Sequence, residues 1–362
     1  MSLIESETPT KAKRLFPLRE VLLPWFVSRL LVDLTLLIAA SSLFGSSKSL
    51  TAGFTGWDFG WYRHIAEFGY GPPPVDGVQS AWPFFPLFPG ILRVAGWFGL
   101  PYGLTAFVVN HAMLLLALGG LYRLASRHLS PNASRLSIWA LALFPASVSF
   151  SLGYPSAIFL AGSVWAFYFL EERRDWAAAL LGVVVTMVRP NGILVVAAMG
   201  LVALQFPIHR HIQKRAILIG TPSLLAIGAW CWQLDQWTGD PFVFWTAKAA
   251  WDELTIIEFI NTQDHAGVVH VAMALAVVGV LVLGWKRLPL AWVVLIAAYL
   301  VPPGLFAVVG LGRYANETFP IAIAAGDLLD RRPKMIRKIV FSASAVALTA
   351  FSVMVVSYDF VP

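Results

Sequence analysis

The chain has 362 residues, of which 58% are hydrophobic and only 13% are charged, and its formal net charge is +6. A soluble globular domain carries about 25% charged residues, so this chain lacks the polar surface to cover a water-soluble body of its size. Its basic residues lie in short clusters between apolar blocks, which is typical of membrane-protein loops and argues against a nucleic-acid partner. The composition therefore predicts an all-α, polytopic transmembrane protein embedded in a lipid bilayer.

Eleven apolar blocks are candidates for membrane-spanning helices, since about 20 residues cross the hydrocarbon core. In chain order the predicted spans are 21–43, 104–124, 136–153, 156–170, 176–188, 192–207, 216–236, 267–285, 288–309, 319–330 and 339–357. No linker, second domain or internal repeat is evident, so residues 1–362 are predicted to form a single domain.

Clusters of Lys and Arg predict the orientation of this bundle, because such residues are retained on the cytoplasmic side. Four of them precede the first span, so residues 1–20 are predicted to be a cytoplasmic lead-in to a multi-pass plasma-membrane protein. With eleven spans, the later basic clusters fall on that same side. The long loops 44–103 and 237–266 fall on the other side, so an active site built from them would be extracytoplasmic.

Residues 57–70 are the most informative part of the first outer loop. At 3.6 residues per turn their large apolar side chains fall on one stripe, which predicts an amphipathic helix lying in the membrane interface. Asp58 has aromatic neighbours, which raise the proton affinity of a carboxylate and favour a general base. Arg63 and His64 follow about one turn later and favour phosphate binding. The alternative is a surface anchor helix in which Asp58 only complements the helix dipole.

Five sequence motifs follow one another along the chain. They are Trp57-Asp58-x-Gly60-x-Tyr62-x-x-Ile65-Ala66-x-x-Gly69-Tyr70, Pro83-Phe84-Phe85-Pro86-Leu87-Phe88-Pro89, Phe144-Pro145-Ala146-Ser147 through Tyr154, Arg189-Pro190-Asn191-Gly192, and Gly312-Arg313-Tyr314. In this order they resemble the PIG-V-type mannosyltransferases of the GT-C superfamily. The basic, Trp-rich chain with its single cysteine favours a bacterial member. At the third motif that family usually has Tyr-x-Glu, whereas this chain has Tyr154-Pro155-Ser156.

The resemblance implies a GT-C fold and an inverting glycosyltransferase that moves a sugar, with mannose expected, from a polyprenyl-phosphate donor to an acceptor hydroxyl. It also implies that an early outer-loop aspartate is the catalytic base, which corresponds to Asp58. The expected partners are the polyprenyl-phosphate sugar and a glycan or glycolipid acceptor. The sequence does not indicate a divalent metal, because it shows no cluster of the three or four ligands that a metal site needs.

The leaving group in such a reaction is a lipid phosphate, which needs cations to stabilise its developing charge. The residues predicted to bind it are Arg189, Arg313, Arg63, His64 and Arg29. Contacts with the substrates are predicted for Trp57, Trp61, Tyr62, Glu67, Tyr154, Asn191, Tyr314 and Glu317. Arg29 also lies four residues before Asp33 in the first span, so an internal ion pair is the simpler interpretation for it.

Two other functions fit the same sequence. A transporter or flippase of a lipid-linked sugar would use intramembrane ionisable residues such as Arg29 and Asp33, but no inverted repeat of broken helices is evident. A non-catalytic subunit of a membrane glycosylation complex fits the altered segment Tyr154-Pro155-Ser156.

Overall fold

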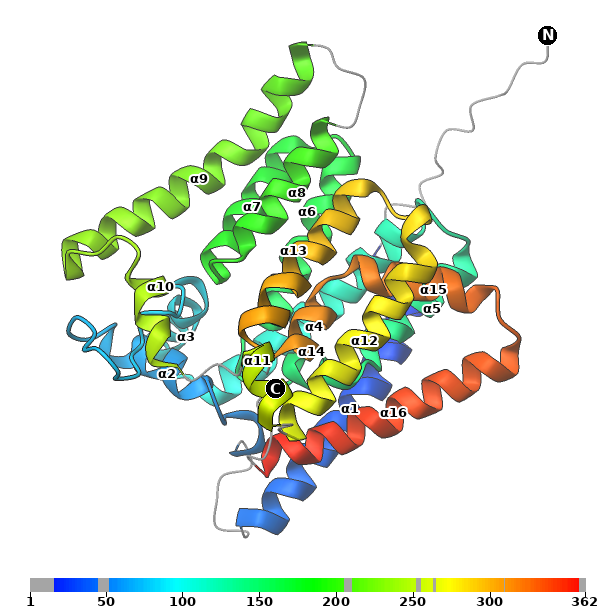
Figure 1. Ribbon diagram of the computed structural model, residues 1–362, viewed down its shortest axis with the longest axis horizontal. Helices are drawn as coiled ribbons and strands as arrows, with labels where there is room; N and C mark the ends of the chain where they lie inside the picture. The colour runs from blue at the N-terminus through cyan, green and yellow to red at the C-terminus, as the bar shows by residue number, and fades with distance from the viewer. Residues whose placement is uncertain are drawn as a thin grey trace.

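The computed structural model describes residues 16–44, 52–204, 210–251, 255–262, 265–308 and 310–357. This part of the chain is helical and contains no β-strand, which confirms the all-α prediction for it. In Figure 1 the long helices α1 (Leu18–Phe44) and α16 (Lys334–Val356) lie along one edge of the bundle, and α9 (Arg210–Thr238) lies along another. Most of the predicted lead-in, 1–20, lies outside the described residues.

Five helices of the described chain are long and apolar enough to cross a membrane. They are α1, α4 (Tyr102–Ala125), α9, α12 (His265–Gly284) and α16. Large apolar side chains on four of them, Leu23, Leu225, Val282 and Val346, are between 60% and 71% exposed. Such faces are stable in contact with lipid chains, so the protein is an integral membrane protein.

Shorter helices match the other six predicted spans. They are α5 (Pro131–Ala142), α6 (Ser156–Glu171), α7 (Asp175–Val188), α8 (Gly192–Leu204), α13 (Leu290–Phe306) and α15 (Pro320–Asp330). Their large side chains form much of the main core, where Phe159, Phe167 and Trp292 are each at most 1% exposed. They are therefore held by packing inside the bundle, while the count of eleven membrane crossings stays a prediction.

One predicted span is interrupted. The sequence predicts a single helix over 136–153, but α5 ends at Ala142 and a 3-10 helix, η3 (Pro145–Phe150), follows it. Pro145 has no backbone N–H and its ring clashes with the carbonyl four residues earlier, so an α-helix does not continue through it. Every residue from 146 to 154 is buried, and the break therefore places an irregular, polar segment inside the bundle.

The predicted outer-loop helix is present as α2 (Phe59–Phe68), which packs against α3 (Leu87–Trp97). The residues that α2 buries are Phe59, Tyr62, Ile65 and Ala66. Its polar residues Arg63, His64 and Glu67 are exposed. The predicted apolar stripe is therefore shifted, and Phe68, which belongs to it, is 70% exposed. A position of α2 in the membrane interface stays a prediction.

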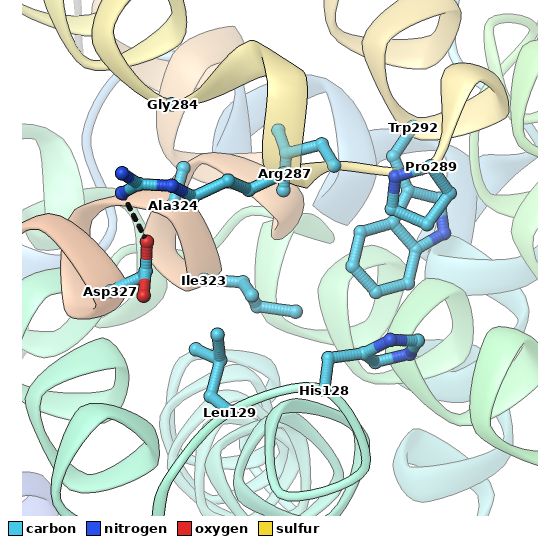
Figure 2. Close-up of a pocket in the computed structure, with 10 residues that line it drawn as sticks. His128, Leu129, Gly284, Arg287, Pro289, Trp292, Ile323, Ala324 and Asp327 are labelled. Atoms are coloured by element: carbon cyan, nitrogen blue, oxygen red, sulfur yellow. Dashed lines mark hydrogen bonds and ion pairs between the residues drawn. The ribbon is translucent and has the colours of Figure 1, made fainter.

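Charged residues at the helix ends gather at one end of the bundle. Arg127 lies 3.0 Å from Glu171, and Arg287 lies 2.7 Å from Asp327. Figure 2 shows a pocket at this end, in which the Arg287–Asp327 pair faces Ile323 and His128 lies near Trp292. The sequence assigns these loops to one membrane side, and the structure brings them together.

Candidate active site

The backbone at Asp58 is set by its neighbour Trp57. Trp57 has a φ of +57°, a left-handed conformation that is costly for a residue with a side chain. Its indole Nε1–H donates to the carbonyl of Val355 in α16 at 3.1 Å, which holds the turn in place. Asp58 precedes α2, makes no capping hydrogen bond with its side chain and leaves 28% of that side chain exposed. The Asp58 carboxylate therefore does not cap α2.

Arg313 faces this carboxylate from the short helix α14 (Leu311–Glu317). Its Nη1 lies 3.7 Å from Oδ2 of Asp58. Its guanidinium carbon lies 5.2 Å from the ring centre of Tyr154 and 5.6 Å from that of Tyr314. The Nε of Arg313 is buried and has no hydrogen-bond partner within the described chain. Arg313 thus has hydrogen-bond donors to spare directly beside Asp58.

Arg189, in contrast, is engaged by protein groups. Its Nη1 donates to the two carboxylate oxygens of Glu317 at 2.6 and 2.5 Å, and its Nη2 donates to Oγ of Ser156 at 3.0 Å. Glu317 is 1% exposed, so this is a buried ion pair. Ser156 stands where the PIG-V-type pattern has glutamate. In this chain Glu317 provides the carboxylate that meets the Arg189 guanidinium.

Two opposing influences act on the pKa of Asp58. Burial raises this pKa above its ordinary value of 3.8, and the charges of Arg313, Arg189 and Lys248 oppose the rise without cancelling it. A raised pKa makes a carboxylate a better general base near neutral pH. Burial also raises the pKa of Tyr62, so the hydroxyl of this 4% exposed side chain stays protonated and can donate a hydrogen bond.

The structure brings most of the predicted site residues together around Asp58. Those gathered around the Asp58–Arg313 pair are Trp57, Tyr62, Tyr154, Arg189, Tyr314 and Glu317. Asn191 is held nearby, since its carbonyl accepts a hydrogen bond from Tyr299 at 3.1 Å, and its buried Oδ1 has no partner within the described chain. Trp61 lies in contact with the rings of Phe84 and Trp251, at 6.2 and 5.5 Å between ring centres.

Four predicted phosphate or substrate residues lie away from this cluster. Arg63, His64 and Glu67 are on the exposed face of α2, where Arg63 lies 3.5 Å from Glu67. Their direction follows from the packing of the opposite face of α2 against the core. Arg29 is 2% exposed and its guanidinium binds η3 instead of facing Asp58. The predicted Arg29–Asp33 ion pair is wrong in detail, because the hydroxyl of Ser151 lies between the two side chains.

His270 is a site-supporting residue that sequence analysis missed. It is completely buried, and its Nδ1 accepts the backbone N–H of Gly312 at 3.2 Å, which fixes the residue before Arg313. A single histidine in an apolar helix has no partner at a recognisable spacing, so the sequence contains no signal for it. At 1.5 Å per residue, His270 lies about 25 Å along the helix axis from Arg287 and its pocket. The charged end of the bundle is thus remote from Asp58.

The described chain contains no group of three or more His, Cys, Asp or Glu side chains placed to hold a metal ion. The polar groups around Asp58 are arginine, tyrosine and asparagine side chains, together with Glu317, which is bound to Arg189. They suit an anionic, hydroxyl-rich ligand, because guanidinium groups bind phosphate and phenol or amide groups hydrogen-bond hydroxyls.

Gly153 is expected to tolerate no side chain, because it lies against α2. A Cβ there would come 2.2 Å from Cδ2 of Phe59, so the start of α2 would have to move. We expect Gly153→Ala to lower the free energy of unfolding by about 1–3 kcal/mol, seen as a lower melting temperature in detergent. Gly60→Ala is the matched control, since nothing lies within 4 Å of a Cβ at that exposed position of α2. Equal losses in both variants would contradict this prediction.

The chain shares its fold with proteins of solved structure. One is ArnT from Cupriavidus metallidurans bound to undecaprenyl phosphate, with a TM-score of 0.60 and 15% sequence identity over 95% of this chain and 78% of that chain. Another is the Archaeoglobus fulgidus oligosaccharyltransferase in its apo form, with a TM-score of 0.51 and 12% identity over 96% of this chain and 57% of that chain. Identities this low show the fold alone.

No protein-family model matches the sequence, and no curated protein does. The resemblance to PIG-V-type mannosyltransferases therefore stays a prediction, as do the bacterial source and the choice of mannose.

Proposed function

We propose that this protein transfers a sugar from a polyprenyl-phosphate donor to an acceptor hydroxyl, with Asp58 as the general base. The observation that carries the proposal is the Asp58–Arg313 pair, in which a carboxylate with a raised pKa lies 3.7 Å from a guanidinium that has donors to spare. The fold shared with ArnT, which was solved with undecaprenyl phosphate bound, supports a lipid-phosphate donor. The PIG-V-type resemblance favours mannose as the sugar.

In the proposed reaction the acceptor oxygen bonds to the anomeric carbon while its proton passes to Asp58. The bond between that carbon and the phosphate oxygen breaks, and its electron pair stays with the lipid phosphate. The phosphate gains one negative charge, which Arg313 stabilises, so the leaving group needs no general acid. Attack opposite the leaving group inverts the anomeric carbon. Asp58 then loses its proton to solvent before the next transfer.

Transfer is the direct test of this proposal. Purified protein is supplied with radiolabelled polyprenyl-phosphate mannose and a panel of glycan and glycolipid acceptors, and labelled acceptor is measured after its separation from the labelled donor. Labelled product that depends on Asp58 supports the proposal. Movement of the labelled lipid across vesicles, without product from any donor or acceptor, would replace it with the flippase alternative.

The flippase alternative has little support from the packing of the bundle. Trp292 lines the pocket at the charged end, and Phe319 lines a second, smaller pocket beside Glu317. The two rings are 5.5 Å apart and each is 1% exposed, so aromatic side chains fill the space between the pockets.

The pH dependence of transfer is expected to report the pKa of Asp58. Only the ionised carboxylate accepts a proton, so the rate falls as the pH is lowered through this pKa. Because burial raises the pKa of Asp58, the midpoint is expected above 3.8. Arg313→Gln removes a charge that lowers the pKa, so the midpoint in this variant moves to higher pH. A midpoint at or below 3.8 in the wild type would contradict the assignment.

We further propose that Asp58 lies on the extracytoplasmic side and the N-terminus in the cytoplasm. A cysteine in place of the exposed Glu67 is expected to react with a membrane-impermeant maleimide added to intact cells. A cysteine in place of Arg287, at the opposite end of the bundle, is expected to react only after permeabilisation. Both variants are made in a Cys231→Ser background, since Cys231 is the single native cysteine. The reverse pattern would place the site in the cytosol.

A further inference from the structure

Arg29 belongs to a buried polar network that joins α1 to η3. Its Nη1 donates to the carbonyl of Ser147 at 3.1 Å and to Oγ of Ser151 at 2.8 Å, and its Nη2 donates to Oγ of Ser147 at 2.9 Å. A charge buried to this extent is stable only when its donors are paired. Arg29 therefore holds the irregular segment that follows the break at Pro145 at two of its residues, Ser147 and Ser151.

The same segment is held at two further points and then reaches the candidate active site. The side-chain amide of Asn110 in α4 donates to the carbonyl of Leu152, and the N–H of Gly153 donates to the carbonyl of Phe54 at 2.8 Å. The next residue is Tyr154, whose hydroxyl lies 3.5 Å from the backbone nitrogen of Asp58. The ring of Tyr154 also supports the guanidinium of Arg313. A shift of this segment would therefore displace both Asp58 and Arg313.

Asp33 and His111 close the network on the far side of Ser151. Oδ1 of Asp33 accepts from Oγ of Ser151 at 2.7 Å, and Oδ2 of Asp33 lies 2.9 Å from Nε2 of His111. The other ring nitrogen, Nδ1, lies 2.8 Å from the carbonyl of Phe107. Both ring nitrogens thus face oxygen acceptors, but a neutral imidazole has only one N–H. Hydrogen bonds from His111 to both of its neighbours therefore need one more proton than a neutral His111 ring and an ionised Asp33 carboxylate carry together.

We infer that Arg29, Asp33 and His111 are positioning residues for the Asp58–Arg313 pair, acting through the segment that ends at Tyr154, and that Asp33 and His111 share the proton that keeps this network closed. The proton lies either on Nε2 of the ring or on Oδ2 of the carboxyl group. The part of this inference that concerns catalysis rests on the proposed transferase function, whereas the shared proton does not.

Few charged groups among the described residues surround the Asp33–His111 pair. Arg29 is the charged group that faces it from α1, through Ser151. The hydroxyl of Ser151, directly after η3, is the polar group that meets Asp33 from this segment, and Phe107 and Trp25 are the rings that contact His111. Helix α16 packs against α1 and η3 with apolar residues and Ser352, and its charged residues lie near its other end.

Asp33→Asn is the variant that separates this inference from a merely structural role. The amide oxygen can accept from Ser151 while the amide Nδ2 donates to Nε2 of a neutral His111, so all hydrogen bonds are kept. The net charge is also kept. In the wild type the charges of the Asp33 carboxylate and the His111 imidazolium cancel, and in Asp33→Asn the amide and the neutral His111 ring are both uncharged. We expect transfer close to the wild-type rate in Asp33→Asn. Asp33→Ala is expected to lower kcat by about 10-fold or more, because a misplaced site slows the chemical step. An Asp33→Asn variant as impaired as Asp33→Ala would overturn the inference.

A spectroscopic measurement tests the proton independently of activity. In the full-length protein labelled with ¹⁵N-histidine, the His111 signal is identified by its loss in His111→Gln. An imidazolium, or a neutral ring with its proton on Nδ1, is the expected result at neutral pH. A neutral ring with its proton on Nε2 would overturn the shared proton. If the expected signal is seen but no donor gives transfer, the proposed function fails while the shared proton stands.

Discussion

Asp58→Asn is expected to lower the rate of sugar transfer by about 10²–10⁴-fold while the protein stays folded. The amide has nearly the same shape as the carboxylate but cannot accept the proton of the acceptor hydroxyl. The side chain makes no capping hydrogen bond to α2 and is 28% exposed, so its replacement removes little packing. The measurement is initial transfer rate at saturating donor, together with the melting temperature in detergent.

Glu67→Gln is the matched control for this experiment. It makes the same chemical change on the same helix, but Glu67 lies on the exposed face of α2 beside Arg63. We expect a rate within the scatter of the wild type. Transfer in Asp58→Asn that matches this control would exclude Asp58 as the base, even if the protein proved to be a transferase.

Arg313→Ala is expected to lower kcat by about 10²–10³-fold, or about 3–4 kcal/mol of transition-state stabilisation, and to raise the donor KM. Removal of the guanidinium leaves the departing phosphate without the donor that faces Asp58 at 3.7 Å. Arg313→Lys is expected to recover only part of the rate, since an ammonium group keeps the charge but loses the planar fork of donors. The measurement is transfer against donor concentration.

Arg189→Ala should behave differently, because its guanidinium is bound to protein. It would leave Glu317 as a buried carboxylate without its cation, and breaking such a pair costs about 3–5 kcal/mol of folding free energy. We therefore expect a large fall in melting temperature in Arg189→Ala and a small one in Arg313→Ala. Arg63→Ala, on the exposed face of α2, is the neutral control. An unchanged kcat and donor KM in Arg313→Ala would refute its phosphate role.

The long helices could be predicted from the sequence because the bilayer imposes their length and their apolar character. The predicted span 104–124 differs from α4 by two residues at its start and one at its end. The prediction of one span over 136–153 was less accurate, because it did not include the break that Pro145 causes in the helix. Hydropathy measures how apolar a block is, and it does not distinguish one helix from a helix followed by an irregular buried segment.

The candidate site could be predicted only in part. The motif resemblance indicated Asp58, Arg189 and Arg313, and the structure brings all three to one end of the bundle. It did not indicate which arginine has free donors, since the partner of Arg189 is Glu317, 128 positions further along the chain. The direction of Arg63 and Glu67 was also beyond a periodicity argument, because a helix in isolation does not show which of its faces the bundle covers.

The sequence by itself determined that this is a helical membrane protein with a basic-loop side and a motif-bearing side. That follows because an apolar solvent requires helices, whose backbone hydrogen bonds are satisfied within each segment. Only the tertiary structure decided which charges are paired, with Arg189 on Glu317, Arg29 on η3 and Arg313 beside Asp58. Charge pairing depends on which side chains packing brings within about 4 Å, and residues far apart in the chain show no spacing from which this could be read.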